Sequence, residues 1–137
     1  MKRLQVVLAL AVFLLLSARA QAQGTAKWAD KYPQTGGTVQ TIAVQGTSAV
    51  ARDWTWSGKA KVVFVQVGGG PEITNLNDLT VDTNNGNWGP KGPVDVPGGS
   101  ANLTSGTNYN VTVSVQMTKN ILTKAWVATD PKQAVAK

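Results

Sequence analysis

The feature that most restricts the fold is a strict alternation of apolar and polar residues between Tyr109 and Met117. Every second residue from Tyr109 to Val115 is apolar, and the residues between them are Asn, Thr, Ser and Gln. Because successive side chains of a strand point to opposite faces, a period of two is typical of a β-strand with one buried face. The valines also favour an extended backbone. We therefore expect a strand over 109–117.

Comparable signals recur along the chain between turn-forming residues. We expect strands at 38–45, 49–56, 59–67, 79–83 and 121–128, and an edge strand or loop in the Gly/Pro-rich stretch 89–99. Gly58 is expected to end one run, and Asn85-Gly86 is expected to form a type I′ hairpin turn. About seven strands without an amphipathic helix predict an all-β fold, an antiparallel β-sandwich.

The ends of the chain lack this alternation. Residues 23–38 contain charged residues, Pro33 and two glycines, and we expect an irregular lead-in. Asp130-Pro131 is expected to stop the last strand, which leaves 131–137 as a flexible tail. The sandwich is then expected over 39–130, as one domain.

The first 22 residues have the three parts of a secretory signal peptide. A basic start is followed by an apolar stretch over 4–16 and by small residues at alternate positions, with cleavage favoured after Ala22 over Ala20. The apolar stretch is shorter than the roughly 20 residues of a spanning helix. We expect a protein that is secreted, periplasmic or at the cell surface, with no membrane span after cleavage.

The composition excludes several kinds of chemistry. The chain has no Cys and no His, so it has no disulfide, no thiolate or imidazole metal ligand and no histidine base. Three of its 13 basic residues lie in 1–22, so the other ten face seven acids, a net charge of +3 without a basic stripe. We expect neither an enzyme nor a nucleic-acid-binding protein, and no metal or cofactor.

The segment 103–113 resembles the tyrosine-corner motif of immunoglobulin-like and fibronectin type III sandwiches. It has a Leu at 103, a turn with Gly106, then Tyr109 and alternating valines, with Ser105 in place of the usual Pro. The stretch 81–88, a strand with an Asn-Gly turn and Trp88, is similar to a segment of bacterial secreted domains of this kind. The resemblance implies a Greek-key sandwich with the Tyr hydroxyl bonded to the turn backbone. It implies no catalytic or binding residue.

Two kinds of binding remain open from the sequence. The loops 68–72 and 84–99 are Gly-rich and are expected to contact a protein partner, which makes the chain a non-catalytic binding or structural protein. Alternatively, Trp54 and Trp56, which share a face if they lie on a strand, form with Trp88 a surface for stacking a polysaccharide. The competing interpretation is that these tryptophans pack in the core.

The Asp/Asn-rich turn 82–87 partly resembles a calcium-binding loop. Asp82 and Asn84 have suitable spacing, but the later bidentate Glu of an EF-hand is missing. Ordinary turn chemistry explains these residues better.

Overall fold

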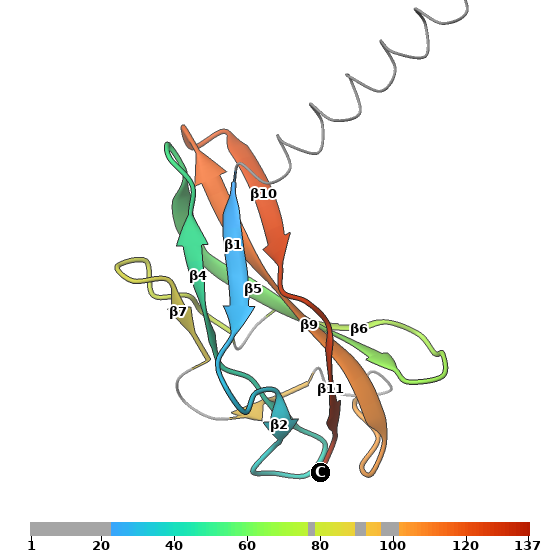
Figure 1. The fold of residues 1–137 in the computed structure, drawn as a ribbon. Helices are drawn as coiled ribbons and strands as arrows, with labels where there is room; N and C mark the ends of the chain where they lie inside the picture. Colours follow the sequence, from blue (N-terminus) through green and yellow to red (C-terminus); the bar gives the residue numbers. More distant parts are fainter. Residues whose placement is uncertain (1–22, 77–78, 90–92, 97–101) are drawn as a thin grey trace, which may run out of the picture.

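The computed structural model describes residues 23–76, 79–89, 93–96 and 102–137 (Figure 1). In these residues the chain is all-β, with eleven strands and no helix. The largest sheet is antiparallel and is built around one long strand. Its strands are β10 (Thr123–Ala128), β9 (Asn108–Lys119), β5 (Thr55–Gln66) and β6 (Ile73–Asn75), in that order, and β11 (Lys132–Val135), which pairs with β9 on the edge away from β5.

Two smaller antiparallel sheets complete the fold. One consists of β1 (Gly24–Trp28), β4 (Gly46–Val50) and β7 (Asn87–Trp88), and the other of β2 (Gln34–Thr35), β3 (Ile42–Ala43) and β8 (Pro93–Val94). In Figure 1, β1 and β4 lie in front of the large sheet near the turn between β9 and β10, and β2 lies beside β11 at the opposite end. This arrangement is compatible with a β-sandwich.

The core lies on one face of the large sheet. Along β9 the side chains of Val111, Val113, Val115 and Met117 are fully buried, as the alternation predicts. Val62 and Phe64 of the neighbouring strand β5 are fully buried as well. The side chains between them, including those of Thr112 and Gln116, point to the other face of the sheet. The face opposite the core is therefore partly open to solvent.

Tyr109 closes the end of this core. Its ring packs edge-on against Phe64 with 6.3 Å between the ring centroids, and its hydroxyl accepts a 2.8 Å hydrogen bond from the backbone N–H of Thr104. Gly106 takes a φ of 80° in the turn, and Leu103 is buried. The expected hydroxyl-to-backbone bond of the 103–113 segment is confirmed.

Both ends of the described chain are more ordered than the sequence predicts. The prediction of an irregular lead-in over 23–38 is wrong, because β1 pairs with β4 over five residues and β2 pairs with β3. The prediction of a flexible tail over 131–137 is also wrong, because β11 pairs with β9. These strands are held by backbone hydrogen bonds and bury small side chains such as Ala26 and Ala134, so they leave little hydrophobic pattern in the sequence.

Two predicted strand boundaries and one predicted turn type are also wrong. The strand expected over 38–45 is reduced to β3, because Thr41 Oγ1 bonds the carbonyl of Thr38 at 2.7 Å in a turn. Gly58 does not end a strand: β5 continues through it with a bulge. The turn at Asn85-Gly86 is not type I′, since only Gly86 of the pair has a positive φ, 78°.

The proposed signal peptide, 1–22, lies outside the described residues. In the described part of the chain, no helix is long and apolar enough to cross a bilayer.

Candidate functional site

The three tryptophans predicted to contact a ligand do not form an exposed platform. Trp88 is fully buried and meets Trp28 edge-on at 5.4 Å between ring centroids, so its assignment to the surface is wrong. Trp54 and Trp56 are half-buried and pack against the core, and Trp54 precedes β5. The competing interpretation, that these side chains stabilise the core, describes their positions better.

The Asp82 turn uses its own polar groups. One carboxylate oxygen of Asp82 accepts a hydrogen bond from the N–H of Asn84 at 2.9 Å, and the other accepts one from the side chain of Asn85 at 3.1 Å. The side-chain oxygen of Asn85 in turn accepts one from the N–H of Asn87. Ordinary turn chemistry accounts for this group of Asp and Asn residues. Among the described residues, no group of three or more acidic side chains lies close enough to hold a metal ion.

The structure instead places a groove beside the bulge in β5. Gly58 has a φ of 82°, and its carbonyl accepts a 3.1 Å hydrogen bond from the N–H of Val81. Lys59 forms a bridge with Thr80. The bulge thus holds the segment around Leu79–Val81 against β5, although this segment is not a regular strand.

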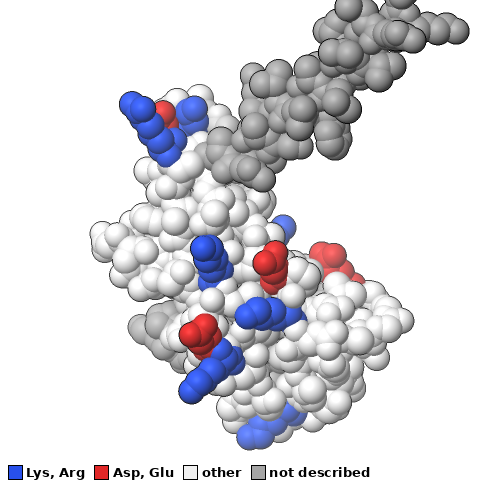
Figure 2. All heavy atoms as spheres, viewed as in Figure 1, with Lys and Arg blue, Asp and Glu red and all other residues white. Residues whose placement is uncertain are grey.

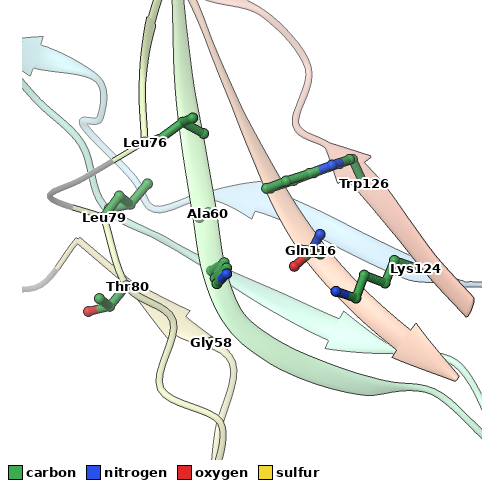
Figure 3. A pocket seen from close by; sticks show the side chains of 9 residues that line it. Gly58, Ala60, Leu76, Leu79, Thr80, Gln116, Lys124 and Trp126 are labelled. Carbon is green, nitrogen blue, oxygen red and sulfur yellow. The ribbon is translucent and has the colours of Figure 1, made fainter. Parts of the chain in front are cut away.

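The groove has a volume of about 480 Å³. Figure 3 shows Trp126 and Lys124 of β10 on one side and Leu76, Leu79 and Thr80 on the other, with β5 and β9 between them. Gln116 stands on β9 in the groove. The described residues that line the groove are Gly58, Lys59, Ala60, Leu76, Leu79, Thr80, Gln116, Lys124 and Trp126.

Trp126 is the most accessible tryptophan of the protein and lies in the groove. All five tryptophans lie in the described part of the chain, and 41% of the surface of Trp126 is accessible, whereas the other four are buried or half-buried. The Lys61 ammonium lies 4.7 Å from the centroid of its ring, which is within the range of a cation–π interaction. Because Lys61 belongs to β5, this contact draws the indole across β9 and over the outer face of the sheet.

The described residues give the groove a positive charge. Lys59 and Lys124 line it, Lys61 lies beside the indole, and none of the described lining residues is acidic. On the face seen in Figure 2, by contrast, basic and acidic side chains are interspersed. An aromatic ring, two leucines and three ammonium groups provide a surface for stacking and for binding an anion.

Sequence reasoning missed Trp126, Leu76 and the lysines around them. The sequence 121–128 did contain a signal for an exposed aromatic residue. On a strand, Trp126 and Lys124 share one face, and Ala125 and Val127 share the other. In this fold Trp126, on the same face of an edge strand as Lys124, is exposed, whereas Trp88 beside a turn is buried. The contribution of Leu79 depends on the bulge at Gly58, for which the sequence offers only a glycine.

No family model matches the chain, and neither a curated protein nor a solved structure matches it.

Proposed function

We propose that the chain is a non-catalytic, exported binding protein that holds an acidic polysaccharide in the groove beside Trp126. The observation that carries the proposal is the exposed indole of Trp126 next to the ammonium group of Lys61. Sugar rings stack on indole faces through their apolar C–H groups, and carboxylates or sulfates pair with lysines. Gln116 and Thr80 offer further hydrogen bonds to sugar hydroxyls.

The proposal includes an immunoglobulin-like sandwich and a cleavable signal peptide at 1–22. The signal peptide would direct the binding module to the cell envelope or outside the cell. The hydrogen bond from the Thr104 N–H to the Tyr109 hydroxyl supports the first part. The basic start and short apolar stretch of 1–22 support the second. The intact mass of the protein purified from the medium or envelope tests the cleavage directly.

The experiment that tests the proposed function measures binding of polyuronates and sulfated glycans, with neutral dextran as the comparison ligand. Because Trp126 is the most exposed tryptophan, it should dominate quenching by iodide, and a bound glycan should relieve that quenching. Trp126→Ala is expected to weaken binding by about tenfold or more, as is usual for a central aromatic anchor. Lys61→Gln and Lys124→Gln should weaken binding and reduce its dependence on salt.

Leu122→Ala is the matched control, because Leu122 is also exposed but lies in the turn at the end of β10. This variant should bind the glycan as the wild-type protein does. If no acidic glycan binds, or if Trp126→Ala binds as tightly as the wild-type protein, the proposed function is wrong. In that case a protein partner at the described parts of the loops 68–72 and 84–99 becomes the better hypothesis.

A further inference from the structure

The turn between β9 and β10 exposes two large apolar side chains. Ile121 is 86% and Leu122 is 91% accessible, the highest values among the large exposed apolar residues of the described chain. A single exposed apolar residue is ordinary on a protein surface. Two adjacent ones at the tip of a long hairpin form a protruding apolar point, and nothing in the described fold covers it.

The backbone at this turn is strained. Asn120 has a φ of 53° and Ile121 a φ of 68°, and the Leu122 N–H donates a 2.7 Å hydrogen bond to the Asn120 carbonyl. Asn adopts left-handed geometry readily, whereas a β-branched residue rarely does so. A Gly or Asn at position 121 would make this turn with less strain. The isoleucine is therefore not explained by the needs of the turn.

Basic residues lie at the same end of the molecule as this apolar point. Lys119 ends β9, and Lys124 follows Thr123 in β10. Arg52 and Asp53 lie in the turn that leads into β5, and this turn is at the same end because Thr55 pairs with Thr118, with 3.1 Å between their hydroxyl oxygens. Figure 2 shows basic side chains with one acidic side chain at the upper end of the molecule. We call Arg52, Asp53, Lys119, Lys124 and the turn 120–122 the tip end.

We propose that the tip end binds the surface of an anionic lipid bilayer, with Ile121 and Leu122 inserted among the headgroups. An apolar point at the same end as several cations matches the order of layers in such a membrane, where anionic headgroups overlie acyl chains. The three cations outnumber the single acid, Asp53, so the tip end is attracted to that surface. A protruding hairpin also reaches into a soft bilayer without requiring a pocket of matching shape.

The first test is co-sedimentation of the protein produced from the full chain with vesicles of phosphatidylcholine alone or vesicles rich in phosphatidylglycerol. Intact mass establishes first whether 1–22 is present, because an apolar leader binds lipid by itself. The wild-type protein should bind the anionic vesicles. The double variant I121S/L122S should partition about tenfold more weakly or worse, because it loses both apolar groups. R52Q/K119Q should lose about thirtyfold, since each cation near an anionic surface contributes about 1 kcal/mol.

Two matched controls distinguish vesicle binding by the tip end from non-specific hydrophobic adsorption and from binding by the groove. Val39→Ser removes another exposed apolar side chain, 67% accessible, from the end of the molecule where β2 lies. Trp126→Ala alters the groove. Both variants should bind vesicles as the wild-type protein does, so the membrane proposal and the glycan proposal fail separately. Circular dichroism of each variant checks that the fold is intact.

The second test uses the absence of native cysteine, which makes an introduced one unique. A nitroxide label on Leu122→Cys should become accessible to oxygen and protected from a polar nickel chelate on anionic vesicles. The same label on Val39→Cys should remain accessible to the chelate. The proposal is overturned if the wild-type protein fails to bind anionic vesicles, if I121S/L122S binds them equally well, or if the label at 122 stays in water. Those results would favour a protein partner with a pocket that binds the tip end.

Discussion

Replacing Tyr109 by Phe removes a single oxygen atom and leaves the ring and its edge-on contact with Phe64 in place. The Thr104 N–H then loses its acceptor, which lies 2.8 Å away in the native protein. A net hydrogen bond of this kind contributes about 1 kcal/mol to the free energy of unfolding. Thr104 is itself exposed, so water reaches part of this site and the loss should not exceed that value by much. We expect Tyr109→Phe to lower the free energy of unfolding by about 1 kcal/mol and Tm by about 4 °C.

Urea unfolding with an unchanged m-value provides the first measurement of this loss. Amide hydrogen exchange provides the second, because the Thr104 N–H should lose protection while the N–H groups within β9 keep theirs. Tyr109→Leu is the comparison variant: it removes the ring as well and should cost about 3 kcal/mol or more. The reasoning is refuted if Tyr109→Phe is as stable as the wild-type protein and the Thr104 amide exchanges no faster.

Two further substitutions test the packing of the sheets. Gly46→Ala places a Cβ against the ring of Trp88 and the carbonyl of Lys27. It should lower the free energy of unfolding, measured by thermal denaturation, by about 3 kcal/mol. In the control Gly70→Ala the added Cβ meets only the side chain of Gln66, so this variant should be nearly as stable as the wild-type protein. Deletion of 132–137 removes β11 and four backbone hydrogen bonds made by residues 136 and 137. It should cost about 4 kcal/mol or more, at about 1 kcal/mol for each bond. A truncated protein that melts with the full chain would contradict the assignment of β11 as part of the sheet.

The long strands were predictable because burial imposes a pattern on their sequence. Val111, Val113 and Val115 alternate with polar residues since one face of β9 meets the core. β1 and β11 were not predictable in this way. They stay in the sheets mainly through backbone pairing, which depends little on side-chain identity, and Ala26 and Ala134 are too small to stand out.

The candidate site was harder to predict than the fold. Trp88 and Trp126 have the same side chain, and only their positions in the sheets make the first fully buried and the second exposed. The pairing of β9 and β10 sets Trp126 opposite Gln116, and the bulge at Gly58 brings the segment around Leu79 to the same groove. These are contacts between distant parts of the chain, and local sequence carries no record of which distant segment will lie beside it.

The central position of β9 has a consequence for the time at which the molecule can fold. Its partner on one edge is β5, with one hydroxyl pair between Thr55 and Thr118, 63 positions apart, and its partners on the other edge are β10 and β11. Contacts of such high contact order form slowly, because a long loop must close before any ladder bond forms. The large sheet also cannot be completed until residues 132–135 have been synthesised. The strand β9 therefore keeps an incomplete edge until nearly all of the described chain has been synthesised, and an incomplete sheet would suit the export that we propose.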